Sequence, residues 1–213
     1  ELGKSYETMK IGVKPYPSCR YTHAAIDALI AMRREHNLTP DQVKRVEIGL
    51  HRNGITLTGD AATKRHPTSI VGGQFSMFFT GALALDQGSF GWDDYNRLGD
   101  AAIDALADKF DVVQDDRLEI GRTHPFGARV SITTDDGVHE RLYADPSGEP
   151  NSFPGAQAMQ QKFLTLARPV LCVCGGTSRA MGLKYVIKYL TADGTNSFGG
   201  VFNADDPQQL ENA

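Results

Sequence analysis

Apolar and polar residues alternate along parts of the chain, and a period of two is typical of β-strands. This alternation predicts a half-buried strand over residues 46–51. It also predicts a hairpin over residues 126–143, with its turn at Asp136 and Gly137. Weaker extended patterns cover two further stretches, residues 9–13 and 112–120. We therefore expect a sheet whose best-defined part is antiparallel.

In other stretches the apolar residues recur every three to four positions, which is the period of an amphipathic helix. The predicted helices cover residues 22–36, 74–85, 93–110, 156–166 and 181–190. Thr39 followed by Pro40 is typical of a helix N-terminus and predicts a single turn up to Val43. Two polar stretches rich in turn-forming residues are expected to be loops, 53–71 and 145–155.

These elements follow one another without the regular strand–helix–strand order of a parallel sheet. The sequence therefore predicts the α+β class, an antiparallel sheet with helices packed on it. We expect one α+β domain over residues 1–155 and a C-terminal helical segment and tail over residues 156–213.

The composition is that of an ordinary folded domain, with 40% hydrophobic and 23% charged residues. A formal net charge of −4 gives no reason to expect a nucleic acid partner, because such partners favour basic proteins. No apolar run reaches the ~20 residues of a membrane helix, so we expect no membrane association. An odd set of three cysteines favours a reduced, cytoplasmic protein. Residue 1 is Glu, which indicates a processed N-terminus or a piece of a longer protein.

The cysteines give no metal-binding pattern. Cys19, Cys172 and Cys174 form no paired C-x-x-C modules, and the last two have no histidine nearby, so we expect no metal site. The glycine-containing run at 175–178 lacks the Lys-Ser/Thr end of a phosphate-binding loop. The sequence also contains no G-x-S-x-G motif.

Residues 14–23 carry the densest set of reactive side chains, between a predicted strand and a predicted helix N-terminus. Lys14 and Arg20 could hold a carboxylate there, because helix N-termini attract anions. His23 could shuttle protons, and Asp27 follows it by one helical turn. The alternative is structural: both cations are solvated and His23 is an ordinary neighbour of the helix cap.

Two further cationic stretches precede predicted elements. Arg65 and His66 could bring a second cation to a shared cleft, or they could form an exposed loop. Arg122 and His124 repeat this chemistry before the hairpin, with the same alternative.

Several blocks of the sequence resemble one known family when they are taken in order. They are KPYPSCRYTHAAIDA at 14–28, GGQFSMFFTGALALDQG at 72–88, RTHPFGARVSITTDDG at 122–137, DPSGEPNSFP at 145–154 and QKF at 161–163. The first 170 or so residues resemble the C-terminal part of the MmgE/PrpD family. That family includes 2-methylcitrate dehydratase, cis-aconitate decarboxylase and iminodisuccinate epimerase.

This resemblance implies a particular architecture and chemistry. Family members have a large helical domain and a smaller α+β lid, with the active site between them, and need no metal or organic cofactor. The present chain would be the lid, followed by helices that return to the all-α domain. Its partners would be a small polycarboxylate substrate, the N-terminal helical domain of the same protein, and a second copy in a homodimer.

The resemblance also suggests site residues. Lys14 matches a lysine that faces the substrate, and His23 matches a frequent family histidine, so we expect these two to be catalytic. We expect Lys14, Cys19, Arg20, Arg65 and His66 to bind substrate. Cys19 stands where the decarboxylase branch carries histidine, and no tyrosine stands near Met77, which argues against decarboxylation.

The leading hypothesis is therefore an enzyme that abstracts a proton next to a carboxylate of a di- or tricarboxylic acid. A dehydratase would then expel a β-hydroxyl group, and an epimerase would return the proton to the other face. The alternative from another class is a non-catalytic module that binds carboxylates or a partner chain.

Overall fold

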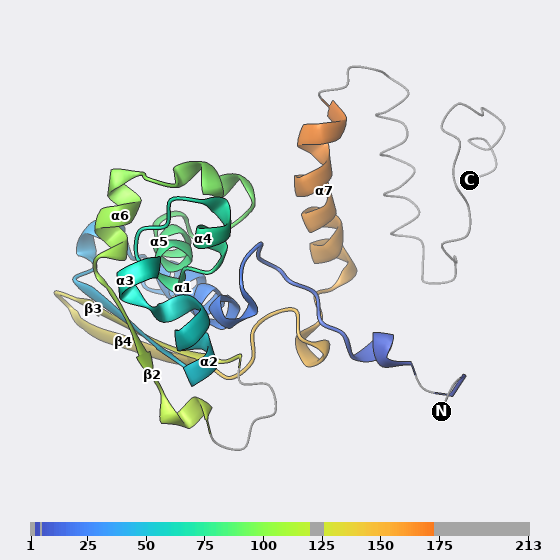
Figure 1. The fold of residues 1–213 in the computed structure, drawn as a ribbon, viewed down its shortest axis with the longest axis horizontal. Helices are drawn as coiled ribbons and strands as arrows, with labels where there is room; N and C mark the ends of the chain where they lie inside the picture. Colours follow the sequence, from blue (N-terminus) through green and yellow to red (C-terminus); the bar gives the residue numbers. More distant parts are fainter. Residues whose placement is uncertain (1–2, 5, 120–125, 173–213) are drawn as a thin grey trace. The chain divides into compact units, whose positions relative to one another are not determined.

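The computed structural model describes residues 3–4, 6–119 and 126–172 (Figure 1). The chain divides into two compact units, Glu1–Phe153 and Pro154–Ala213, which are described separately. The second unit contributes one described helix, α7 (Ala156–Cys172), which is longer than the predicted 156–166. Among the described helices, none has the length and apolarity needed to cross a membrane.

A four-stranded sheet forms the first unit's scaffold, in the order β2-β1-β3-β4. The strands are β1 (Arg45–Leu50), β2 (Phe110–Gln114), β3 (Ala128–Thr134) and β4 (Gly137–Tyr143). β3 pairs antiparallel with both β1 and β4, whereas β1 and β2 are parallel. The predicted α+β class is confirmed, and the sheet is antiparallel except for this pair, whose strands are joined by a helical crossover.

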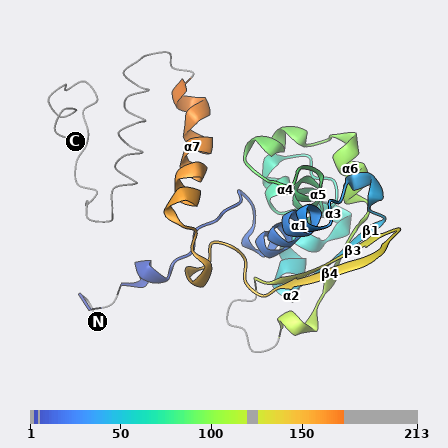
Figure 2. The ribbon, with the colours of Figure 1, turned by 180° about the vertical axis from the view of Figure 1, so that it is seen from behind.

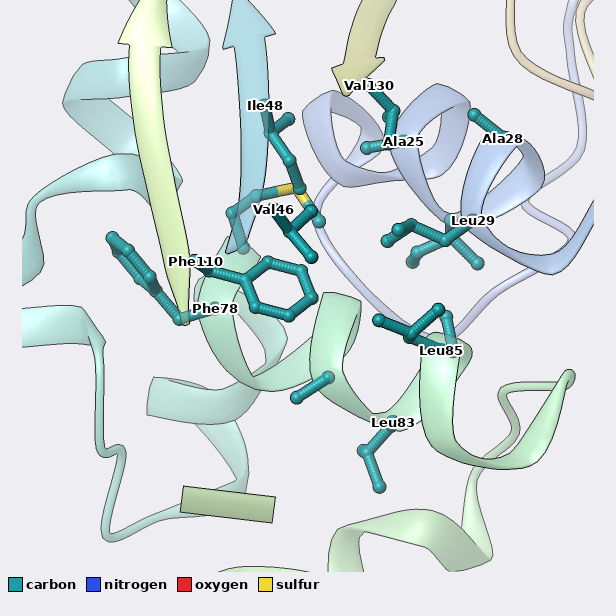
Figure 3. Close-up of a cluster of buried hydrophobic side chains, with 14 of the residues drawn as sticks. Ala25, Ala28, Leu29, Val46, Ile48, Phe78, Leu83, Leu85, Phe110 and Val130 are labelled. Carbon is teal, nitrogen blue, oxygen red and sulfur yellow. The ribbon is translucent and has the colours of Figure 1, made fainter. Parts of the chain in front are cut away.

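Helices α1 (His23–Glu35) and α5 (Met77–Gln87) pack on one face of this sheet, and α6 (Ala101–Ala107) packs against α5. They lie on the same side of the strands in both views (Figures 1 and 2). Figure 3 shows Leu29 of α1, Leu85 of α5 and Phe110 of β2 gathered with the inward side chains of β1. All of these side chains are fully buried. The alternation predicted for β1 and the helical period predicted for α1 and α5 therefore produce this core.

Close packing of α5 on β2 depends on one glycine. A Cβ atom at Gly81 would lie 2.7 Å from Cε1 of Phe110, whose side chain is fully buried in the core. The ends of α5 follow sequence rules: the Ser76 hydroxyl accepts from the Phe79 amide at 3.0 Å. Gly88 ends the helix with φ +70°, a backbone conformation that favours glycine.

The stretch predicted to be a loop, 53–71, is mostly helical, and the prediction is wrong. It contains α2 (Arg52–Gly54), a π-helical turn (Ile55–Gly59), α3 (Ala61–Lys64) and the start of α4 (Ile70–Gln74). Polar residues before three of these turns accept backbone N–H groups with their side chains, namely His51, Asp60 and Ser69. Such caps stabilise short helical turns that lack an apolar period.

Other predicted boundaries need correction. The predicted strand 9–13 is wrong: Glu7–Lys10 is a 3-10 turn, and the Val13 amide donates to a loop carbonyl, that of Gly148, at 2.8 Å. The predicted helix 93–110 is interrupted by Gly99, with φ +76°, so that a 3-10 turn (Asp93–Arg97) and α6 are separate. Phe110 already belongs to β2.

The remaining elements lie close to their predicted places. The short turn Pro40–Gln42 follows Thr39 as predicted. The extended stretch predicted over 112–120 is wrong after residue 114, because β2 ends at Gln114 and Asp116–Leu118 is a 3-10 turn. The hairpin turn consists of Asp135 and Asp136, one residue earlier than predicted, because Gly137 pairs with Thr134. The predicted helix 181–190 lies outside the described residues.

The contact at Gly81 generates a prediction about stability. We expect Gly81→Ala to lower the free energy of unfolding by about 1–2 kcal/mol, because overpacking of a core exceeds the ~1 kcal/mol gain in helix propensity. Urea unfolding followed by circular dichroism measures this change. Gly91→Ala is the matched control, since its Cβ would meet only Asp94 Oδ2, at 3.8 Å, and should change stability by less than about 0.5 kcal/mol. An unchanged or raised stability for Gly81→Ala would contradict the packing argument.

Candidate functional site

The Lys14 loop, residues 14–19, leads into α1 through a 3-10 turn at Arg20–Thr22. Neighbouring elements hold its backbone at two places. The Cys19 amide donates to the Gln74 carbonyl at the end of α4, at 2.8 Å. The Tyr95 hydroxyl donates to the Pro17 carbonyl at 2.7 Å. The loop is therefore fixed by residues that are far from it in the sequence.

Lys14 and His23, the two predicted catalytic residues, meet at one backbone oxygen. The ammonium Nζ of Lys14 donates to the Ser18 carbonyl at 3.1 Å, and Nε2 of His23 lies 3.3 Å from the same oxygen. A carbonyl only accepts hydrogen bonds, so this contact requires a hydrogen on Nε2. Lys14 is exposed, whereas His23 is 1% exposed. The cation thus lies at the surface, and the imidazole lies beneath it.

Asp27 binds the phenol next to His23 and a distant loop. One carboxylate oxygen accepts from the Tyr16 hydroxyl at 2.7 Å, and the other accepts from the Ser147 amide at 2.7 Å. The Tyr16 ring meets the His23 ring edge-on, with centroids 5.5 Å apart. Burial, followed by the charge of Asp27, raises the pKa of Tyr16, so the phenol remains a donor at neutral pH.

Arg20 is partly exposed, whereas Cys19 is buried. The Arg20 guanidinium is bound to both carboxylate oxygens of Glu149, with an Nε–Oε1 distance of 2.6 Å. It also lies 4.5 Å above the centre of the Phe126 ring. Cys19 is a free cysteine, and its side chain is buried.

Arg65 and His66 bind a different part of the fold. Nη1 of Arg65 donates to the carbonyls of Ala107 and Phe110, at 2.9 and 2.8 Å. His66 lies between two carboxylates of the α6 region, 3.3 Å from Asp104 and 2.9 Å from Asp108. These contacts hold the end of α6 and the start of β2, whereas the Lys14 loop binds Gln74 and Tyr95.

A buried histidine at the end of β1 was not predicted as a site residue. His51 is 7% exposed: its Nδ1 accepts from the Asn53 amide at 3.1 Å, and its Nε2 lies 3.0 Å from Glu119 Oε2. Tyr21 stacks on its ring. In the alternating pattern of residues 46–51, His51 falls on the polar side with Glu47 and Gly49. Nothing in the neighbouring sequence predicts that it is buried. Since both ring nitrogens are bound, we interpret the pair as a structural connection between β1 and the 116–119 turn.

Charged residues form a network on the sheet face opposite the helices. Arg129, which is 8% exposed, donates to Asp115 at 2.8 Å and to Glu47 at 2.6 Å. Arg117 binds both oxygens of Asp115, at 2.9 and 2.7 Å. These hydrogen bonds from Arg117, opposed by burial and assisted by Arg129, hold the pKa of Asp115 well below its usual range. The network is neutralised internally and gives a structural explanation for these charges.

In the part of the chain that the structure describes, no candidate metal cluster is found, and neither of two pockets is lined by a residue of the Lys14 loop. Within the described residues, no group of three or more His, Cys, Asp or Glu is placed to hold a metal ion. Two pockets, of about 330 and 380 Å³, lie near the C-terminal end of α1. One is lined by the stacked rings of His36 and His139, and the other by Arg33 and Arg34. Arg122 and His124 lie outside the described residues.

Comparison with known proteins gives one clear match. The family model described as the MmgE/PrpD C-terminal domain matches residues 16–174, about three quarters of the chain. The match includes His23, Cys19, Arg20, Arg65 and His66, and it begins two residues after Lys14. No curated protein matches the chain.

The lowered pKa of Asp115 generates a pH-dependent prediction. A carboxyl group whose folded pKa is lowered stabilises the fold above its unfolded pKa of about 3.9, and this contribution is lost as the pH falls below that value. We expect Asp115→Asn to cost about 2 kcal/mol at pH 7, because Arg129 and Arg117 lose a charged partner. The cost should shrink at pH 3. Urea unfolding at both pH values measures it, with Asp41→Asn as an exposed control. An equal cost at both pH values would contradict the ionic role.

Proposed function

Because the chain belongs to the MmgE/PrpD family, we propose that it is the C-terminal part of a lyase of the dehydratase type. The enzyme would abstract a proton next to a carboxylate of a small di- or tricarboxylic acid. The observation that carries this proposal is the placement of Lys14, an exposed residue whose ammonium group is held at the same Ser18 carbonyl as the buried ring of His23.

Lys14 supplies the electrostatic part of the chemistry. Removal of a proton next to a carboxylate delocalises negative charge onto that carboxylate. A cation fixed in advance stabilises this charge in the transition state more than in the substrate, and this difference accelerates the reaction. The ammonium group of Lys14 and the ring of His23 both contact the Ser18 carbonyl oxygen. In this proposal the Lys14 loop therefore positions the ammonium group before substrate binds.

For His23 the contacts favour a positioning role over direct proton transfer. Its ring is 1% exposed, Nε2 is bound to the Ser18 carbonyl, and Tyr16 covers one side of it. In this proposal His23 orients the carbonyl that holds Lys14, and the proton-abstracting group belongs to the N-terminal helical domain of the same protein.

The same arrangement serves two reactions of the family. After proton abstraction, loss of a β-hydroxyl group is dehydration, and return of the proton to the opposite face is epimerisation. Both pass through the same charged intermediate, so Lys14 has the same role in each. We propose dehydration as the primary reaction and epimerisation of an iminodisuccinate-like dicarboxylate as the alternative, in a cytoplasmic homodimer.

A second candidate is a non-catalytic module that binds carboxylates. The burial of His23 favours it, because Lys14 can bind an anion while the nearby imidazole takes no part in proton transfer. Proton NMR in D₂O separates the two candidates when this chain is combined with the N-terminal helical domain and incubated with citrate, 2-methylcitrate, cis-aconitate or iminodisuccinate. Loss of a signal next to a carboxylate, or a new vinyl signal, supports the enzyme; binding without either supports the module.

We expect Lys14→Ala to weaken citrate binding about tenfold or more, because a charge-assisted hydrogen bond contributes roughly 1.5–3 kcal/mol. NMR titration of the 213-residue chain measures the affinity. Lys10→Ala removes an exposed ammonium group that pairs with Glu7 and should leave the affinity unchanged. Equal affinities for wild type and Lys14→Ala would exclude Lys14 from the site.

His23 is tested by two substitutions in the assembled enzyme. The amide of glutamine can still donate to the Ser18 carbonyl, so His23→Gln should keep most of the turnover, whereas His23→Ala should lose about tenfold or more. The dependence of kcat on pH should be the same for His23→Gln and wild type. Equal loss in both variants, or a changed pH profile for His23→Gln, would instead assign His23 to proton transfer.

A further inference from the structure

We propose that Arg20 and Glu149 are positioning residues: their ion pair clamps the Glu149 loop, residues 145–152, against the Lys14 loop. The clamp thereby fixes the cation that meets the substrate. The role of the clamped cation rests on the proposed function, whereas the clamp itself rests on contacts between the two loops.

The ion pair joins groups that are 129 residues apart in the sequence. Nε of Arg20 donates to Oε1 of Glu149 at 2.6 Å, and a second nitrogen contacts Oε2. Two parallel contacts of this kind fix the relative orientation of both side chains as well as their distance. The Phe126 ring under the guanidinium restricts it further. The side chain of Glu149 is only 16% exposed, so solvent weakens this pair less than an ordinary surface ion pair.

Two hydrogen bonds made by residues on either side of the Lys14 loop also hold the Glu149 loop next to it. The Val13 amide donates to the Gly148 carbonyl at 2.8 Å, and the Ser147 amide donates to Asp27 at 2.7 Å. A Cβ atom at Gly12 would lie 2.6 Å from the Gly148 carbonyl oxygen. The close approach therefore requires glycine at this position, where a side chain would separate the two backbones.

The Glu149 loop is itself internally bonded. The Gly148 amide donates to the Ser152 carbonyl at 3.1 Å, and the Ser152 hydroxyl donates to the Pro146 carbonyl at 2.9 Å. Gly148 has φ +93°, which favours glycine. A rigid loop transmits the restraint of the ion pair at Glu149 to the hydrogen bond at Val13.

Lys14 follows directly after Val13, so the clamp sets one end of its loop. The other end is set by the Cys19–Gln74 hydrogen bond. With both ends of the Lys14 loop fixed, the loop backbone already has the conformation in which the ammonium group reaches the Ser18 carbonyl. Release of the first end would let Lys14 sample other positions, and the entropy lost on substrate binding would then weaken affinity.

The same contacts argue against Arg20 as a substrate ligand, the role that the sequence suggested. Its Nε and one terminal nitrogen already bind a carboxylate of the protein, at an effective concentration that a free substrate does not match. The two roles make opposite predictions for Glu149→Gln. Loss of the clamp weakens substrate binding, whereas release of a substrate-binding guanidinium strengthens it.

The experiment uses the 213-residue chain and two measurements, amide hydrogen exchange at Val13 and Ser147 and NMR titration with citrate. Arg20→Glu and Glu149→Arg should each speed exchange at both amides about tenfold or more, because each places like charges in contact. The double charge reversal should return exchange to within about threefold of wild type. Glu149→Gln should weaken citrate binding about threefold or more. Lys44→Glu, which breaks an ion pair with Asp135 at the hairpin turn, is the control and should change neither measurement.

Each outcome decides a separate part of the proposal. Unchanged exchange in both single reversals, or a double reversal no closer to wild type than the singles, overturns the clamp. Tighter citrate binding by Glu149→Gln overturns the positioning role and makes Arg20 a ligand. If wild type binds no citrate, 2-methylcitrate, cis-aconitate or iminodisuccinate, this unit has no substrate site of its own and the role of the clamped cation is overturned, while rescued exchange in the double reversal still supports the clamp.

Discussion

Helix α5 can approach β2 closely only because residue 81 is glycine, and the position of the Lys14 loop depends on that approach. The fully buried Phe110 ring occupies the space that a side chain at 81 would need. Once α5 is seated, Ser76 begins it, and the Gln74 carbonyl just before it accepts from the Cys19 amide. The contact between the α5 backbone and the Phe110 ring thus helps to determine where the Lys14 loop turns into α1.

The second determinant is the pairing of two loops from opposite ends of the first unit. Neither loop contains regular strand structure, so neither can obtain its backbone partners from a sheet. Val13 and Gly148 bond to each other, and Asp27 adds a side-chain acceptor for Ser147. Because buried or close-packed N–H groups must find partners, the two loops order each other. Asp27 is central to this arrangement, since it also holds the Tyr16 hydroxyl against His23.

Features set by local periodicity could be predicted from the sequence, and features set by tertiary partners could not. The alternation of β1 and the helical period of α1 and α5 identify the core because each element buries one face. The stretch 53–71 has no such period, and its turns depend on caps from His51, Asp60 and Ser69. At the site, the sequence brought Lys14, Arg20 and His23 together because they are neighbours. It could not indicate Glu149, since nothing near residue 149 reveals that Arg20 is its partner.

The contacts around Lys14 bear on how the proposed chemistry is divided between this unit and the N-terminal helical domain. Arg20 is neutralised by Glu149, and both oxygens of Asp27 accept hydrogen bonds from neutral donors within this unit. Under the proposed function, this unit contributes a cation for the step that dehydration and epimerisation share. The fate of the intermediate then depends on the groups that supply or remove protons from the other side of the substrate. A lid built in this way can serve several reactions without change, because it stabilises negative charge and leaves the choice of product to its partner domain.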